Sequence, residues 1–463
     1  MINDFISRED LPLFTSGSRF SLGLVFLREG MKDDLATFDL FVRGFPPSRN
    51  FLVFGGLEHV VNYLQNLELS NEQLNWLAQQ FHFSPEEMEY FRNFKFTGDV
   101  WAMPEGTIFF PNEPIIRITA PLIEAQIIEM FLINAIYLQT ALASKIARFV
   151  VAANGKSTAL GFNRSYGTDA AMKATRWSKV FGAKTSLAIY DYKNTDNPPF
   201  AVGTFHYLIM AFDSELEAFR KYLAFTKGAG YVLVDTYNSI QGIKNFIKAA
   251  KELESEGIKA TGIQLDSGDL YELSMQARKM LNEAELTQAK IFAMSNLDEW
   301  KVADLEKRGA PIDVYAGVTG LLTPSDAPTL ELVYKLSEVK KGEVVLPKMK
   351  TSTQKISLPG RKQVYRILKD GKYSGDIITT EQEDVVGEKL LTQVMRQGEV
   401  VYSFPTLEEI GKYFYMQKGK FDSKIFDVNS KFDYSVTVSD ELRRLAEKTK
   451  EEINRVHHYD VDF

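Results

Sequence analysis

The chain has 463 residues, of which 45% are apolar and 25% charged, a composition typical of an ordinary soluble globular protein with roughly three domains. It contains no cysteine, which excludes disulfides, thiol catalysis and zinc–thiolate sites and is compatible with a cytoplasmic location. The formal net charge of −7 argues against a general nucleic-acid or anionic-membrane surface, so a polyanionic substrate would need a local positive site.

The N-terminal segment carries acidic residues where a secretion signal needs a basic start and an apolar run, so we expect no signal peptide. The most apolar segment, 127–138, is interrupted by Glu129 and Asn134. It falls short of the ~20 residues that a membrane span requires and is predicted to be a buried helix.

Residues 1–135 mix helical and strand-like patterns and are predicted to form an α+β domain. Apolar residues recur at helical spacing over 57–67, and Ser70 with Gln73 reads as a capping box that opens the next helix. The segment 96–110 alternates like strands joined by a Pro-Glu-Gly turn.

Residues 136–340 repeat short strand-then-helix units. The predicted strands are 231–234, 262–265, 290–294 and 312–315. Such units predict a parallel sheet, for which a closed α/β barrel competes with an open doubly wound sheet.

Residues 341–463 follow a segment rich in Lys and Gly and are predicted to form a C-terminal extension. Near its end, 441–455 combines spaced leucines with several charges and is predicted to be a solvated amphipathic helix.

The clearest candidate site is the segment 261–270, where an apolar strand runs into Asp266, Gly268 and Asp269 and a helical pattern follows at once. A glycine there permits a tight turn that brings backbone N–H groups to a phosphate at the helix start. The carboxylates would meet ribose hydroxyls or a phosphate-bound Mg²⁺. An ordinary turn with a helix cap explains the same pattern.

Polar residues also end the neighbouring strands: Asp235, then Ser295 and Asn296, then the turn 317–320. Barrel enzymes place their chemistry at that end of the strands, which favours one shared site. The alternative is that these residues are helix N-caps, which strand-to-helix turns require anyway.

The five histidines show no metal-binding spacing, and no phosphate loop, dinucleotide fingerprint or serine-nucleophile elbow is present. His206 follows a Gly-Thr turn that contains Thr204. Its own setting fits a packed core histidine as well as a catalyst.

Motifs in order along nearly the whole chain resemble bacterial nicotinate phosphoribosyltransferases. They include Phe-Gly-Gly-Leu-Glu, Phe-Thr-Gly-Asp, Gln-Leu-Asp-Ser-Gly-Asp and Leu-Pro-Gly-Arg-Lys-Gln-Val-Tyr-Arg, and lie at 51–58, 94–100, 112–114, 138–140, 234–237, 262–269, 295–299, 333–336 and 358–366. The resemblance implies an irregular α/β barrel of the type II phosphoribosyltransferase kind, with an N-terminal α+β domain and a C-terminal extension.

The family reaction joins nicotinate to the ribose of phosphoribosyl pyrophosphate and gives nicotinate mononucleotide for NAD synthesis. The resemblance implies that His206 is phosphorylated by ATP and that Asp235 and Asp266 are catalytic, with Mg²⁺ expected alongside the pyrophosphate. It also implies a homodimer acting on small molecules in the cytoplasm, without nucleic acid or membrane. No metal ligands are assigned.

The same resemblance implies a set of substrate-binding residues. Arg164 would face the carboxylate of the acceptor, and the other members are Thr204, Ser267, Gly268, Asp269, Ser295, Asn296, Gly317, Val318, Thr319 and Gly320.

The sequence departs from the family pattern where ligands bind. The tyrosine and the aromatic residue that cover the pyridine ring correspond to Ser18 and Leu160, and arginines correspond to Asn163, Gln264 and Leu321. The family's Gly-Thr-x-Ala-His is also one residue short before His206.

Each lost arginine removes charge-assisted bonds worth about 1.5–3 kcal/mol. A divergent enzyme is therefore the main hypothesis. The alternative is a paralogue that has lost catalysis and acts as a binding or regulatory protein, or that uses another ring carboxylate. Phe162 and Tyr166 are possible replacement aromatics.

Overall fold

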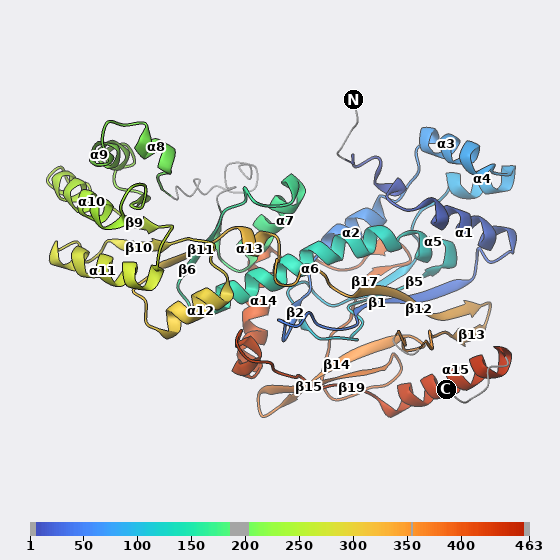
Figure 1. Ribbon diagram of the computed structural model, residues 1–463. Coiled ribbons are helices and arrows are strands. Elements are labelled where there is room, and N and C mark those ends of the chain that lie inside the picture. The colour runs from blue at the N-terminus through green and yellow to red at the C-terminus, as the bar shows by residue number, and fades with distance from the viewer. Residues whose placement is uncertain (1–5, 186–202, 353–354, 458–463) are drawn as a thin grey trace. The chain divides into compact units, whose positions relative to one another are not determined.

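The computed structural model describes residues 6–185, 203–352 and 355–457 (Figure 1). The chain divides into two compact units. The first contains residues 1–141, 329–425 and 431–463, and the second contains 142–328 and 426–430. The predicted boundary at 135/136 lies close to this division, whereas most of the predicted C-terminal extension shares a unit with the N-terminal residues.

The first unit is built on a seven-stranded sheet. Its described strands run in the order β13 (Val344–Pro347), β12 (Leu332–Lys341), β1 (Leu35–Val42), β5 (Ile116–Pro121), β3 (Asp99–Ala102), β17 (Thr392–Arg396) and β18 (Glu399–Val400). Strand β1 pairs antiparallel with both β12 and β5. The three strands from the N-terminal part of the chain, β1, β5 and β3, therefore form the middle of the sheet, and strands from later in the chain extend it on both sides.

The first unit also contains several helices and short elements among its described residues. They are η1 (Leu11–Leu13), α1 (Gly17–Arg28), α2 (Leu57–Gln65), α3 (Asn71–Phe81), α4 (Pro85–Arg92), α5 (Leu122–Ile127), α14 (Leu407–Lys420) and α15 (Asp440–His457), with η3 (Ser423–Phe426) and the two-stranded sheet of β2 (Leu52–Val53) and β4 (Ile108–Phe109). The predicted capping box is confirmed, because Ser70 accepts from the Gln73 N–H and the Gln73 side chain accepts from the Ser70 N–H. The predicted strands within 96–110 are β3 and β4, but they lie in different sheets.

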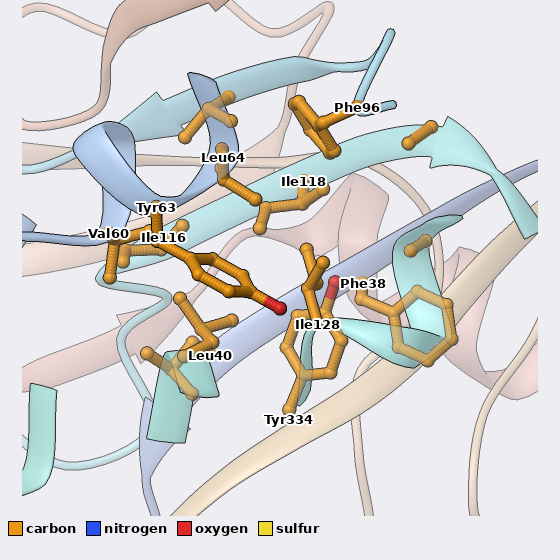
Figure 2. Close-up of a cluster of buried hydrophobic side chains, with 14 of the residues drawn as sticks. Phe38, Leu40, Val60, Tyr63, Leu64, Phe96, Ile116, Ile118, Ile128 and Tyr334 are labelled. Carbon is orange, nitrogen blue, oxygen red and sulfur yellow. The ribbon is translucent and has the colours of Figure 1, made fainter. Parts of the chain in front are cut away.

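One face of the seven-stranded sheet is apolar. Figure 2 shows Leu40, Ile116 and Ile118 from adjacent strands packed with Tyr63 and Tyr334, all of them buried. Because side chains alternate along a strand, the intervening residues of β1 point to the opposite face.

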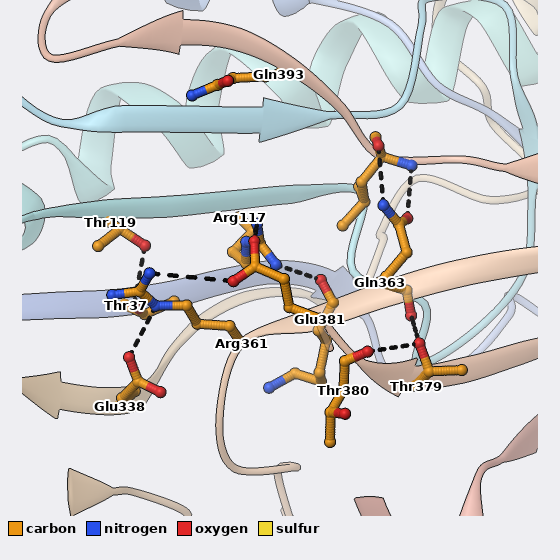
Figure 3. A network of polar contacts seen from close by, with 12 residues as sticks. Thr37, Arg117, Thr119, Glu338, Arg361, Gln363, Thr379, Thr380, Glu381 and Gln393 are labelled. Atoms are coloured by element: carbon orange, nitrogen blue, oxygen red, sulfur yellow. Dashed lines mark hydrogen bonds and ion pairs between the residues drawn. The ribbon is translucent and has the colours of Figure 1, made fainter. Parts of the chain in front are cut away.

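That opposite face is polar and meets a second sheet of order β16 (Glu388–Lys389), β14 (Lys362–Lys369), β15 (Lys372–Thr380) and β19 (Val436–Val438). Figure 3 shows its centre, where Arg117 pairs with Glu381 and Arg361 donates to Glu338 at 2.8 Å. Arg117 also donates to the Lys362 carbonyl at 2.7 Å. Charged side chains therefore hold the two sheets together.

The second unit contains a parallel sheet of order β7 (Lys184–Thr185), β6 (Ser157–Leu160), β11 (Val314–Gly317), β10 (Lys290–Ala293), β9 (Gly262–Leu265) and β8 (Tyr231–Leu233). Its described helices are α7 (Gly167–Val180), α8 (His206–Met210), α9 (Glu215–Phe225), α10 (Ser239–Glu254), α11 (Leu270–Glu283), α12 (Glu299–Lys307) and α13 (Thr319–Leu322). Strands β8 to β11 are neighbours in chain order, as in a curled half-barrel and unlike a doubly wound sheet, whose order reverses. The predicted parallel sheet is confirmed; its last strand begins at Val314, two residues later than expected.

The longest apolar helix is α6 (Glu129–Ala152). Among the described residues it alone has the length and hydropathy of a membrane span, and 67% of its apolar window is buried inside the protein. Burial of that extent is typical of a core helix, as predicted for 127–138.

Candidate functional site

The candidate residues gather at one edge of the parallel sheet. Leu233, Gln264 and Phe292 are aligned across β8, β9 and β10, so the residues that follow each strand emerge side by side. The ladder extends past the strand ends, because the Val234 N–H donates to Gln264 and the Met294 N–H donates to Leu265. This register brings the loops that carry Asp235, Asp266 and Ser295 to the same place.

A carboxylate pair forms the centre of this edge. The Ser267 hydroxyl donates to Oδ2 of Asp235 at 2.5 Å. Burial raises the pKa of Asp266, and the nearby charge of Asp235 raises it further, while a hydrogen bond from the Ser295 backbone and the charge of His206 oppose the shift. Three further predicted residues, Ser267, Ser295 and His206, therefore interact with Asp235 or Asp266.

The second carboxylate oxygen of Asp235 is not used by the bond to Ser267. Its Oδ1 atom is buried and has no hydrogen-bond partner among the residues that the structure describes. A buried acceptor without a partner costs about 1–3 kcal/mol, so such an atom is expected to meet a ligand hydroxyl or a cation.

His206 begins α8, and its side chain is exposed. Its Nδ1 atom lies 3.2 Å from the Thr236 hydroxyl, and its Nε2 atom has no hydrogen-bond partner among the residues that the structure describes. The flanking rings of Phe205 and Tyr207 are stacked, with centroids 5.5 Å apart, and are 60% and 71% exposed. An exposed histidine is therefore flanked in sequence by two exposed aromatic side chains.

Thr204 serves as the anchor of this segment. Its hydroxyl accepts from the Leu233 N–H at 2.8 Å, and its own N–H donates to the Tyr231 carbonyl at 3.0 Å. The buried Thr204 thus fixes the start of α8 against β8, and a direct substrate contact for it stays a prediction.

Asp269 is the N-cap of α11, as predicted by the alternative of an ordinary turn with a helix cap. Its Oδ1 accepts from the N–H groups of Tyr271 and Glu272 at 3.0 and 3.1 Å. Gly268 has φ +79°, and a Cβ there would lie 2.9 Å from Leu273, so the turn requires glycine. Substrate binding by these two residues stays a prediction.

The loop after β10 has an unusual backbone conformation. Ser295 and Asn296 both have positive φ, 86° and 50°, without being glycine. Such conformations carry strain and cluster at functional sites.

The predicted phosphate turn 317–320 is a strand end and a short helix. Gly317 ends β11, and a Cβ there would lie 2.0 Å from the Leu321 side chain, so internal packing explains this glycine. Val318 precedes α13, which Thr319 and Gly320 begin. The segment reaches the common edge because β11 lies between β10 and β6.

Arg164 lies in an exposed turn after β6 and makes no ion pair with any described residue. Its position beyond β6 places it at the same edge of the sheet, but no hydrogen bond or ion pair joins it to Asp235 or Asp266. Of the two candidate replacement aromatics, Phe162 is 5% exposed and Tyr166 is 74% exposed. Only Tyr166 is free to cover a ring in this conformation.

Comparisons with known proteins identify the family. Residues 13–137 match the nicotinate phosphoribosyltransferase N-terminal domain, and residues 385–446 match the C-terminal domain of the same family. The pncB2 nicotinate phosphoribosyltransferase of Mycobacterium tuberculosis is 36% identical over 433 residues, covering 93% of this chain and 92% of that protein. The chain belongs to the nicotinate phosphoribosyltransferase family.

Two further relatives agree with this assignment. Nicotinate phosphoribosyltransferase of Bacillus subtilis is 37% identical over 391 residues, covering 83% of this chain and 79% of that protein. The crystal structure of human nicotinic acid phosphoribosyltransferase superposes with a TM-score of 0.81 over 94% of this chain and 99% of that one, at 23% identity. The last comparison shows the shared fold.

Relative to the family pattern, Gln264 stands where an arginine is usual. It is 6% exposed, and its amide lies 3.2 Å from the Met294 sulfur. Its Oε1 is buried and accepts no hydrogen bond from any residue that the structure describes. A neutral side chain therefore replaces a cation on the strand that leads to Asp266.

Sequence reasoning missed Thr236, which contacts His206, and Glu215. Burial raises the pKa of Glu215, and the charge of Asp235 adds to the shift, while a hydrogen bond from Asn245 opposes it. Thr236 directly follows Asp235 in a motif already singled out, but the sequence gives no signal that Glu215 approaches the site.

Sequence reasoning also missed a buried ionic network behind the loops. The Lys145 ammonium lies 2.6 Å from both Glu299 and Asp326, and Arg148 donates to Glu299 at 2.9 Å. Glu299 begins α12 just after the strained Ser295–Asn296 loop, and Asp326 follows α13. Lys145 therefore connects the segment that follows β10 to the segment that follows β11.

Proposed function

We propose that this chain is a nicotinate phosphoribosyltransferase of NAD biosynthesis. The single observation that carries the proposal is the group of Asp235, Asp266, Ser267 and His206 at one sheet edge, in a chain 36% identical to a protein of that name. The reaction forms a bond between the ring nitrogen of nicotinate and C1 of the ribose. The bond from C1 to the pyrophosphate oxygen breaks, and its electron pair leaves with pyrophosphate.

Each carboxylate has a role in this reaction. The unpartnered Oδ1 of Asp235 would accept a hydrogen bond from a ribose hydroxyl, and Ser267 holds Oδ2 in place. Positive charge develops on the ribose as the leaving group departs, and the carboxylates of Asp235 and Asp266 oppose it electrostatically.

Mg²⁺ would be held jointly by the pyrophosphate and one of these carboxylates. Oxygen ligands from one or two carboxylates plus substrate phosphates are the usual arrangement for this ion, and Asp235 Oδ1 fits it. Among the described residues no group of three or more acidic or histidine side chains could hold a metal without the substrate. Bound Mg²⁺ would neutralise charge on the leaving pyrophosphate.

His206 would receive the γ-phosphoryl group of ATP. With Nδ1 facing Thr236, the exposed Nε2 is the nitrogen that can attack the γ-phosphorus, releasing ADP; water would later hydrolyse the phosphohistidine. Coupling this hydrolysis to turnover is the role that the family resemblance gives the residue.

The finer architecture belongs to the same proposal: a closed type II phosphoribosyltransferase barrel in a cytoplasmic homodimer. The exposed rings of Phe205, Tyr207 and Tyr237 at the site edge support a second subunit there, because large exposed aromatic surfaces favour a partner. Sedimentation of the purified chain tests the dimer directly.

A turnover assay tests the activity. The purified chain is incubated with nicotinate, phosphoribosyl pyrophosphate and Mg²⁺, with and without ATP, and nicotinate mononucleotide is quantified by chromatography. We expect product in both reactions and more with ATP. No product under either condition would favour a paralogue that binds without catalysis, and product only from another pyridine or imidazole carboxylate would establish a shifted acceptor.

A further inference from the structure

A cavity with a volume of about 270 Å³ lies within the first unit, between the seven-stranded sheet and the four-stranded sheet. Polar residues of β1, β12 and β14 line one side: Asp39, Lys335 and Lys362. The remaining wall is largely apolar and includes Phe41, Pro111, Pro114, Ile378, Val436 and Val438. The activity proposed above uses none of these residues.

The acidic side of the cavity is buried and incompletely paired. Asp39 is 2% exposed, and its Oδ2 lies 2.8 Å from the Lys362 ammonium. That ammonium also donates to the carbonyls of Leu358 and Gly360 at 2.9 and 2.6 Å, so its three protons are used. Oδ1 of Asp39 is buried and has no hydrogen-bond partner among the described residues. Asp39, which lines the cavity, thus carries an acceptor that lacks a donor.

Lys335 is the second cationic residue of the lining. Lys335 lies directly opposite Asp39 in the β1–β12 ladder, so both side chains project from the same face of the sheet. No ion pair or hydrogen bond joins its ammonium to any residue that the structure describes. Burial lowers its pKa, and the charges of Arg43 and Lys350 oppose the attraction of Glu129.

The charges of Asp39, Lys335 and Lys362 indicate the charge of the ligand that the cavity would bind. One carboxylate and two ammonium groups leave a net charge of +1 in the cavity, which matches a monoanion and not a zwitterion. The apolar wall matches a hydrophobic body and disfavours bare phosphate, which would leave that wall uncovered.

We propose that this cavity binds a small monocarboxylate with an apolar body and a neutral N–H or O–H donor next to the carboxylate. The carboxylate pairs with Lys335, the donor bonds to Asp39 Oδ1, and the body packs against the apolar wall. Nicotinate is a poor match, because its ring nitrogen is an acceptor and cannot donate to Asp39.

Anthranilate is the probe, because it carries an amino group next to its carboxylate and is fluorescent. Its fluorescence anisotropy is titrated with the full-length chain. We expect saturable binding of one molecule per chain that excess nicotinate and phosphoribosyl pyrophosphate do not displace. Benzoate lacks the donor. The dissociation constant of benzoate, measured by its competition with anthranilate, should be about tenfold higher than that of anthranilate, as expected for the loss of one hydrogen bond to a charged group.

Variants locate the site. Lys335→Met should weaken binding by tenfold or more, as expected for a charge-assisted bond, and Lys335→Arg should largely preserve it. Val438→Trp should prevent binding by filling the half-buried wall. Lys340→Met is the matched control, since Lys340 lies on the same strand but outside the cavity lining.

Three results would overturn the proposal: no saturable binding at millimolar anthranilate, displacement by nicotinate, or unchanged binding in both Lys335→Met and Val438→Trp. Circular dichroism verifies that each variant is folded, and Lys335→Met alone decides if the tryptophan variant is not. Because binding is measured without turnover, its failure is distinguishable from failure of the catalytic proposal.

Discussion

The hydroxyl of Ser267 donates to Oδ2 of Asp235 and thereby joins the loop after β9 to the loop after β8. The bond occupies one oxygen of the carboxylate, while the other is buried and has no hydrogen-bond partner in the described part of the chain. A group fixed in this way needs little reorganisation when positive charge develops nearby, which is the condition for efficient electrostatic stabilisation.

Asp235→Asn is therefore expected to lower kcat by about 10²–10³-fold, a loss typical of removing one electrostatic group from a reaction centre. The neutral amide keeps the shape but loses the negative charge. Initial rates of nicotinate mononucleotide formation measure the effect. Asp213→Asn, at an exposed position of the same unit, should leave the rate unchanged; equal effects of the two substitutions would remove Asp235 from the mechanism.

Substitutions of Asp269 separate capping from catalysis. Asp269→Ala should destabilise α11 by about 1 kcal/mol, because the N–H groups of Tyr271 and Glu272 lose their acceptor. Asp269→Asn should retain the cap. Hydrogen exchange of the first turn of α11 reports the difference directly. Turnover that falls in Asp269→Asn while exchange protection persists would establish a substrate contact in addition to the cap.

Lys145→Met should destabilise the second unit by about 3–5 kcal/mol, because it leaves the fully buried Glu299 with one cationic partner fewer. The midpoint of chemical denaturation measures the loss. Lys156→Met is the matched control: its ion pair with Glu306 is partly exposed, and its removal should cost about 1 kcal/mol or less. Similar losses in the two variants would contradict the structural role assigned to the network.

Glu124 is expected to make the stability of the first unit depend on pH. Burial raises the pKa of Glu124 to about 7, although hydrogen bonds from the N–H and hydroxyl of Thr97 and the charge of Lys95 oppose the shift. A carboxyl group with a raised folded-state pKa stabilises the fold fully below its unfolded pKa, and this contribution is lost as pH rises through the folded value.

Glu124→Gln should therefore stabilise the protein relative to wild type at pH 8 and have little effect at pH 4. Thermal melts at the two pH values provide the measurement. A stability difference independent of pH would show that Glu124 keeps the same protonation state in the folded and unfolded chain.

Strand-and-helix units were predictable where the local signal was strong. The apolar strand before Asp266 and the capping residues at Ser70 follow from residue type and spacing alone. The grouping of Asp235, Asp266 and Ser267 was also predictable, because aligned parallel strands end together.

Other features depend on contacts between distant segments. Strands β3 and β4 are adjacent in sequence but pair in different sheets, because β5 and β17 occupy the two edges of β3 while β4 pairs with β2. The sequence around Gly317 suggested a phosphate turn, whereas the close approach of Leu321 explains that glycine. Likewise, Glu215 and Lys145 reach their partners only through tertiary packing, for which spacing along the chain offers no signal.

The attachment of Thr204 to β8 limits how far the neighbouring imidazole can travel. Only Phe205 separates the anchored threonine from His206, and the chain is one residue shorter here than is usual in the family. The backbone of His206 is therefore held close to β8. If His206 is the phosphoryl acceptor proposed above, the phosphoryl donor has to come to the histidine, because the histidine backbone cannot travel far toward the donor.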